Sequence, residues 1–176
     1  MIFEPTPITG AFVVRPERVV DERGYFARTY CVRELTEQGL DPAISQASLS
    51  FNRRRGTLRG MHFQAAPHEE NKIVSCQRGS FFDVIVDLRR ESPSYKRWFG
   101  VTLTEDEATA LYIPKGCAHG FITLADDTLV HYFISGFYHP ESARGVRFDD
   151  PAFAIEWPLP PVVIAARDRA FPDFAG

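Results

Sequence analysis

The sequence predicts one all-β domain over residues 1–176, a sandwich or barrel of short strands. Short apolar runs recur along the chain with Gly, Pro, Asp and Ser between them, which is typical of strands joined by turns and not of alternating strands and helices. Aromatic residues make up 13% of the chain, with 15 Phe, and suit a β-rich core. A length of 176 residues is enough for one domain with a sizeable core and short for two.

The expected strands follow one another from end to end of the chain. The apolar runs interpreted as strands are Gly10–Val14, Ile44–Phe51, Leu58–Gln64, Lys72–Cys76, Ser80–Leu88, Trp98–Leu103, Ala108–Ile113, Phe121–Leu124 and Leu129–Phe137. The run Phe81–Leu88 is almost continuously apolar, which predicts burial on both faces, with Asp83 and Asp87 on one side of the pleat. Only two helices are expected, over Val32–Gln38 and near Ala165–Ala170.

Composition narrows the class of protein. The net charge of −3 argues against a nucleic-acid partner, which normally requires a basic face. Cys31, Cys76 and Cys117 are widely spaced, so we expect neither a disulfide framework nor a cysteine-rich zinc site. We also expect no secretory signal in Met1–Pro7 and no apolar run that spans a membrane. A cytoplasmic protein is the simplest interpretation.

The densest group of chemically capable residues lies in Leu58–Gln64, with Lys72 in the following run. Its histidine, His62, has apolar neighbours and lies close to Gly60, which allows another backbone to approach. Such a histidine can act as a general base near neutral pH. A hydrogen-bonded core histidine is the alternative, and the residues themselves do not decide between the two.

Two further segments contain candidate groups. Pro and Gly residues in Pro114–Phe121 indicate a sharp passage between strands that places His119 at the barrel mouth, where it could ligate a metal, bind phosphate or cap a turn. By pleat alternation Tyr132 shares a face with Val130, and His131 lies on the opposite face. An inward-facing tyrosine could donate a proton, although a simple hydrogen bond to the backbone is the more usual role.

Positive charges within apolar segments suggest an anionic ligand. Arg59 and Lys72 lie inside strand runs, where an unpaired cation is costly. A phosphate group would supply the missing partner, because Arg binds phosphate through two parallel hydrogen bonds. A diphosphate-linked substrate meets this requirement. The run Arg53–Arg55, in contrast, is typical of a solvated loop.

A series of motifs runs in one order through nearly the whole chain. It comprises Asp21–Phe26, Leu58–Gln64, Lys72–Val74, Gly79, Phe82–Arg89, Ser92–Ser94, Ile113–Phe121, Tyr132, Tyr138, Asp149–Pro151, Ile155–Pro158 and Arg167–Asp168. The series resembles the dTDP-4-dehydrorhamnose 3,5-epimerases, and such an ordered set is far more specific than any single motif. The resemblance implies an antiparallel cupin (jelly-roll) barrel with one or two short helices, a homodimer, and a nucleotide-diphosphate 4-keto sugar as substrate.

The resemblance also implies catalytic roles. His62 would be the base, and Asp168 would orient it and stabilise its imidazolium. Lys72 would stabilise an enolate oxygen, and Tyr132 would deliver a proton from the opposite face of the sugar. No cofactor is expected, because a C4 ketone acidifies the hydrogens on C3 and C5 and leaves only proton transfers to be catalysed.

A metal is not expected either. The arrangement typical of metal-binding cupins has a His-x-His pair with a Glu and a further His, whereas this chain has His62-x-Gln64. The segment His68-Glu69-Glu70 follows Pro67 and is typical of a solvated loop.

Substrate binding is assigned by the resemblance to Arg23, Arg28, Gln46, Ser48, Arg59, Lys72, His119, Tyr138 and Arg167. Four positions depart from the family pattern. Arg28 replaces a Glu, Ser48 replaces the Asn of a Gln-x-Asn motif, Ala143 replaces a Glu, and Arg167 replaces a Lys. The departures concern binding and not proton transfer. They motivate the hypothesis of a non-standard base or sugar, such as a CDP- or GDP-linked sugar, which normal affinity for a thymidine nucleotide would contradict.

Three functions agree with these residues. The first is a 3,5-epimerase, for which Tyr132 is the distinguishing residue. The second is a mono-epimerase or 3,4-ketoisomerase, because a small change in pocket shape can stop the reaction after one centre. The third is a binding protein without activity, which predicts loss of the base or its partner, yet His62 and Asp168 are both present.

Overall fold

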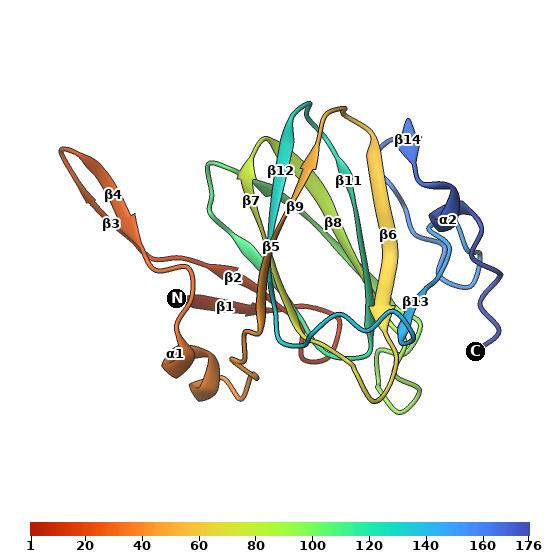
Figure 1. The fold of residues 1–176 in the computed structure, drawn as a ribbon. Helices are drawn as coiled ribbons and strands as arrows, with labels where there is room; N and C mark the ends of the chain where they lie inside the picture. Colours follow the sequence, from red (N-terminus) through yellow and green to blue (C-terminus); the bar gives the residue numbers. More distant parts are fainter.

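The computed structural model describes residues 1–176 as fourteen strands and two short helices (Figure 1). In chain order the strands are β1 (Ile2–Pro5), β2 (Phe12–Arg15), β3 (Arg18–Asp21), β4 (Gly24–Ala27), β5 (Gln46–Asn52), β6 (Thr57–Gln64), β7 (Lys72–Arg78), β8 (Ser80–Asp87), β9 (Trp98–Thr104), β10 (Ala110–Ile113), β11 (Cys117–Thr123), β12 (Thr128–Ile134), β13 (Ala143–Gly145) and β14 (Val163–Ile164). The helices are α1 (Val32–Glu37) and α2 (Ala166–Arg169). Neither is long and apolar enough to cross a membrane.

Two sheets pack against each other as a jelly-roll barrel (Figure 1). The first sheet has the strand order β1-β2-β10-β7-β12-β5. The second has the order β13-β6-β11-β8-β9, and β14 pairs with β6 in parallel. All the other pairings are antiparallel, as the family resemblance implied. The expected strands occur close to their predicted places, while β1, β3, β4, β13 and β14 were not predicted.

The core between the sheets determines which side chains point inward. Val74 of β7 and Val130 of β12 are fully buried and pack with Phe81 of the opposite sheet. Because side chains alternate along a strand, Lys72 and Tyr132 point into the same interior as these valines. The sheets therefore bring a cation and a phenol to one inner wall.

The outer face of the second sheet is covered by the C-terminal part of the chain. Val84 of β8 packs there with Phe153 and Trp157, so β8 is buried on both faces, as predicted. Beyond this cover the chain turns back, and Val163 and Ile164 pair with the first residues of β6. This pairing carries α2 to the edge of the barrel, beside the middle of β6.

Strands β6 and β11 contain a β-bulge where they line the interior. His62 of β6 pairs with His119 of β11, and the next pair is Arg59 with Phe121. Between these two pairs β6 has one residue more than β11. The two strands can approach closely because each has a glycine here, Gly60 in β6 and Gly120 in β11. A Cβ atom on Gly60 would lie 2.5 Å from the Cα of Gly120. The extra residue resets the alternation, so Arg59 and His62, an odd and an even position, both face one cavity.

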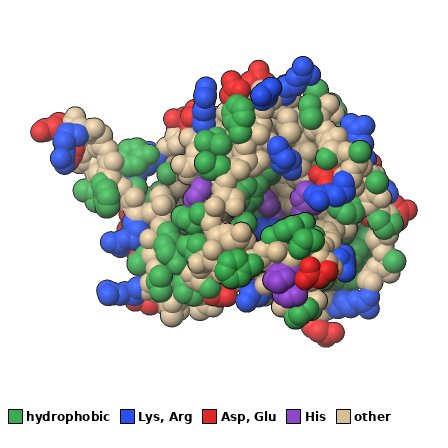
Figure 2. Space-filling view, viewed as in Figure 1, with side chains coloured by type: hydrophobic (Ala, Val, Ile, Leu, Met, Phe, Trp, Pro, Cys, Tyr) green, Lys and Arg blue, Asp and Glu red, His purple; other side chains and the backbone are tan.

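The β3-β4 hairpin projects from the body of the molecule (Figures 1 and 2). Its apolar side chains are open to solvent, and Val19, Val20 and Phe26 are 70%, 73% and 74% exposed. Monomeric surfaces rarely display such large apolar side chains together. The hairpin therefore has the character of a contact surface.

Candidate active site

A cavity of about 470 Å³ opens between the two sheets and adjoins a second lobe of about 510 Å³. Four side chains line both lobes: His62, His119, Tyr132 and Arg167. His62 and His119 come from the second sheet, and Tyr132 comes from the first, so the cavity has chemically active groups on two facing walls. Histidine side chains are visible in the hollow in the middle of the face shown in Figure 2, with Lys and Arg around it.

His62 forms an ion-pair hydrogen bond with Asp168, 2.8 Å from Nε2 to Oδ1. Asp168 is 2% exposed, and its second oxygen accepts the backbone N–H of Gly60 at 3.2 Å. Burial alone would raise the pKa of Asp168, but its hydrogen bonds with His62 and Gly60 outweigh burial and lower it. The carboxylate is therefore held in its charged form against one nitrogen of the imidazole.

His119 forms a second, deeper pair with Asp83, 2.6 Å from Nε2 to Oδ1. Burial raises the pKa of Asp83, whose other oxygen has no hydrogen-bond partner. The predicted sharp passage is the turn at residues 114–116 between β10 and β11, but His119 lies beyond it, within β11, all of whose residues are buried. Asp83 was not assigned to the site, although a carboxylate inside a continuous apolar run signals a buried partner.

Tyr132 lies on the wall of the first sheet, and its ring is 5.9 Å from that of His119. Burial, with a smaller effect from the Asp83 carboxylate, raises the pKa of Tyr132 well above its usual range. Tyr30 and Tyr112 donate their hydroxyl groups to backbone carbonyls, whereas Tyr132 faces the cavity without such a bond. Its hydroxyl remains protonated and is directed to whatever the cavity holds.

Lys72 has a partner within the chain. Its Nζ lies 3.2 Å from Oε1 of Glu70, and the two side chains are 12% and 10% exposed. The other oxygen of Glu70 accepts a hydrogen bond from the Gln64 amide at 2.8 Å. The prediction that Lys72 requires an anionic ligand as counter-charge is therefore wrong, as is the assignment of Glu70 to a solvated loop. The interpretation was wrong because the segment turns back over the cavity.

Arg59, Arg144 and Arg167 are the other cations that line the cavity. Arg59 donates only to neutral groups, the Asn52 side chain at 2.8 Å and the Phe51 carbonyl at 3.5 Å. Arg167 is mostly exposed, with its Nε 3.5 Å from the Asp168 carboxylate. Arg59 lines the second lobe, Arg144 lines the first and Arg167 lines both, so cationic groups occur in both parts of the cavity.

The remaining predicted binding residues divide into two groups. Ser48 and Tyr138 line the first lobe, with Tyr138 61% exposed at its rim. Gln46 does not line either lobe. Arg23 and Arg28 lie in and just after the β3-β4 hairpin, where they pair with Asp21 and Glu34 of the same chain. Lining residues without a predicted role include Ser50, Phe63, Arg144 and Phe171.

The arrangement is suited to moving protons on a bound carbonyl compound. A carboxylate-supported imidazole lies on one wall and a protonated phenol on the other. The ammonium group of Lys72 lies on the same wall as the phenol of Tyr132. A cation in this position stabilises an oxyanion that develops on the bound compound. The residue types and their positions therefore support abstraction and return of a hydrogen next to a ketone.

Comparisons with known proteins agree with this chemistry. The model of the family described as dTDP-4-dehydrorhamnose 3,5-epimerase matches residues 5–176. A dTDP-4-dehydrorhamnose 3,5-epimerase of Methanothermobacter thermautotrophicus is 41% identical over 170 residues, 95% of this chain and 91% of the relative. A dTDP-4-dehydrorhamnose 3-epimerase of Streptomyces niveus is 38% identical over 96% of this chain and 82% of its own. The crystal structure of the 3,5-epimerase from Bacillus anthracis with TDP and PPi bound has a TM-score of 0.94 and 35% identity, and covers 98% of this chain and 99% of that one.

Proposed function

Because the chain belongs to the dTDP-4-dehydrorhamnose 3,5-epimerase family, we propose that its substrate is a dTDP-linked 4-keto-6-deoxy sugar bound between the two sheets. The protein is an isomerase that acts on a nucleotide-linked 4-keto-6-deoxy sugar. The observation that carries the assignment of roles is the His62–Asp168 pair, which lies across the cavity from Tyr132. Inversion of a carbon centre requires a base on one face and an acid on the other.

In this proposal His62 removes the hydrogen from C3 or C5. Asp168 fixes the imidazole through one nitrogen, so that the other is free to accept the proton, and then stabilises the imidazolium. Tyr132 returns a proton from the opposite side of the ring. Its raised pKa supports this role, because the hydroxyl keeps its proton until the enolate takes it.

The enolate oxygen lies, in our proposal, beside Lys72, which Glu70 holds in place. A fixed cation is worth more in a cavity with little water than in solution, since the effective dielectric constant is lower. The ketone of the substrate supplies the activation of the neighbouring hydrogens, so the proposed steps use only side chains of this chain.

Arg59 and Arg167 are the proposed diphosphate ligands, because both line the second lobe of the cavity. Ser48 and Ala143, two of the positions that depart from the family pattern, line the first lobe instead. The relatives are named for dTDP sugars, which favours dTDP over the CDP or GDP that the departures suggested.

We further propose that the protein works as a homodimer. The apolar face of the β3-β4 hairpin suits a second copy of the chain, and the hairpin carries Arg23, which is 84% exposed. Arg23 and Arg28 do not line the cavity of their own chain, so a dimer in which the hairpin reaches the neighbouring cavity would reconcile their position with nucleotide binding. Sedimentation velocity tests this, with Val19→Asp expected to give a monomer and Val162→Asp, also exposed, as the control.

A cytoplasmic location is proposed from the cysteines. All three are free thiols, as is usual in a reducing compartment. Cell fractionation tests this proposal, and recovery of the protein with secreted proteins would contradict it.

The function is tested by proton NMR in D2O with dTDP-, CDP- and GDP-linked 4-keto-6-deoxy sugars. We expect deuterium at both C3 and C5 of the dTDP sugar. Incorporation at C3 alone would support the second candidate, a mono-epimerase, which the relative named as a 3-epimerase favours. His62→Ala should abolish exchange while leaving dTDP binding nearly unchanged, and full exchange in this variant would contradict the assigned base.

A further inference from the structure

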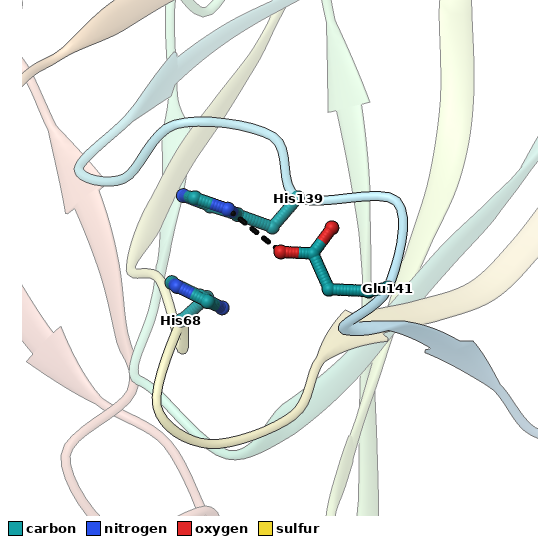
Figure 3. Close-up of side chains that lie close together, drawn as sticks. All are labelled: His68, His139 and Glu141. Atoms are coloured by element: carbon teal, nitrogen blue, oxygen red, sulfur yellow. Dashed lines mark hydrogen bonds and ion pairs between the residues drawn. The ribbon is translucent and has the colours of Figure 1, made fainter.

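Three potential metal ligands gather at the rim of the first lobe, outside the proposed proton-transfer groups (Figure 3). His68 comes from the loop between β6 and β7, and His139 and Glu141 come from the loop between β12 and β13. One ligand atom from each lies within 4.8 Å of the others. The imidazole rings are stacked, with centroids 3.6 Å apart and planes 9° from parallel.

Hydrogen bonds hold the two imidazole rings in their present directions. Each ring has one nitrogen already engaged: Nδ1 of His68 with the Ser142 hydroxyl at 2.8 Å, and Nδ1 of His139 with Glu141 at 3.1 Å. A metal-bound histidine usually has a second contact of the kind that His68 makes with Ser142, which fixes the direction of the ring. An ion bound by His139 and Glu141 would replace the hydrogen bond between these two side chains.

We propose that His68, His139 and Glu141 bind a divalent transition-metal ion such as Zn²⁺ or Co²⁺, with water completing the coordination. Two imidazoles and a carboxylate form a ligand set that Zn²⁺ accepts. Bonds of about 2.0–2.2 Å bring tetrahedral ligand atoms to about 3.3–3.6 Å from one another. Because the ligand atoms are at present up to 4.8 Å apart, they have to approach by up to about 1.2–1.5 Å. Movement of the exposed Glu141 side chain and rotation of the two rings can supply this approach.

An ion at this position would tie the two loops together at the edge of the active site. Gln64 already connects them, since its amide donates to the carbonyls of His68 at 3.1 Å and Phe137 at 2.9 Å. Its own carbonyl accepts the backbone N–H of His139 at 2.7 Å. Tyr138, which lies in the sequence between Phe137 and His139, lines the cavity. The bound ion would hold the Tyr138 loop against the barrel.

The site differs from the position at which the sequence argued against a metal. That argument concerned His62 and Gln64 inside the barrel and assigned His68 to a solvated loop, without the partners that His139 and Glu141 provide on the second loop at the rim. Binding to the cluster requires no substrate. Its test is consequently independent of the proposed function.

The experiment is a titration of the purified protein with Co²⁺ and Zn²⁺, followed by the cobalt absorption spectrum and by calorimetry. We expect one ion per chain and at least a tenfold loss of affinity in His139→Asn. His131→Asn is the matched control, because His131 lies in a separate pocket on the outside of the barrel. Equal binding by wild type and His139→Asn, or no binding by wild type, would overturn the site. Circular dichroism establishes that each variant is folded.

The effect on the loop has its own measurement. Hydrogen exchange of the backbone amides over residues 137–142 should slow on addition of Zn²⁺ in the wild type and in His131→Asn. In His139→Asn it should stay unchanged. An ion that binds without protecting this segment would refute the proposal that it fixes the loop.

Discussion

The substitution Asp168→Asn removes one charge from the proposed base pair and leaves its shape almost unchanged. The native carboxylate accepts from two sides, the imidazole at 2.8 Å and the Gly60 N–H at 3.2 Å. An amide has only one oxygen, so it either leaves the Gly60 N–H unpaired or presents its NH₂ group to the imidazole. The second arrangement requires the wrong tautomer of His62.

The size of the effect follows from the geometry. The charge of an imidazolium is spread over its ring, whose centre lies about 4 Å from the carboxylate, and two opposite charges at that distance attract by about 4 kcal/mol at an effective dielectric constant of about 20. Asp168 is 2% exposed, so solvent screens this interaction little. Loss of about 4 kcal/mol from the step that forms the imidazolium corresponds to about a thousandfold loss of rate.

The assay is wash-in of deuterium at C3 and C5 of the dTDP-linked sugar, with dTDP affinity measured separately. We expect exchange at both centres to fall by about a thousandfold while dTDP binding changes little. Asp150→Asn is the matched control, since Asp150 is 1% exposed and accepts two backbone N–H groups far from the cavity. If Asp168→Asn kept more than about a tenth of the wild-type rate, the carboxylate would not be stabilising the base, and the assignment would be refuted.

Three further predictions concern other groups. Tyr132→Phe should slow inversion of the carbon centres at least tenfold more than it slows deuterium incorporation. One NMR series measures both, as the amount of epimerised product and the amount of deuterium in the sugar. Equal slowing of the two processes would argue against Tyr132 as the proton donor. Glu70→Gln should lower the free energy of unfolding by about 2 kcal/mol in urea denaturation, because it leaves Lys72 without its partner. Adding Lys72→Met to this variant should restore part of the lost stability. If the effects of the two substitutions were strictly additive, the two residues would not be coupled. Burial raises the pKa of Asp87, but hydrogen bonds from Arg89 and nearby serines outweigh it and hold the pKa at about 2. This carboxylate should therefore stabilise the fold above its ordinary pKa of about 3.9 and lose about 2 kcal/mol as the pH falls towards 2, a loss absent from Asp87→Asn in acid denaturation curves.

The barrel and the proposed proton-transfer residues could be predicted from the sequence for different reasons. Apolar runs with turns between them indicate strands directly, and the alternation within Val130–Ile134 correctly separated Tyr132 from His131. The pairing of His62 with Asp168 came only from the resemblance, because nothing local to either residue indicates contact across such a separation. The short parallel pairing of β14 with β6 produces that contact.

Other features depend on how strands meet. The bulge beside Gly60 reverses the side on which Arg59 lies, and no pattern within one strand shows an extra residue relative to its neighbour. Glu70 has the local pattern of a loop residue, yet the loop folds back so that Glu70 reaches Lys72. The β3-β4 hairpin was missed because its apolar residues are too few to distinguish a strand from a linker.

The separation of His62 from Asp168 also sets a time at which the site comes into being. The two residues are 106 positions apart, and a ribosome adding about 5–20 residues per second needs about 5–20 s to pass from one to the other. Over that interval the nascent chain gains the strands β7 to β14 after the imidazole of β6, and the carboxylate comes last. Each newly made chain therefore contains all the strands of its barrel before it contains the partner of its base.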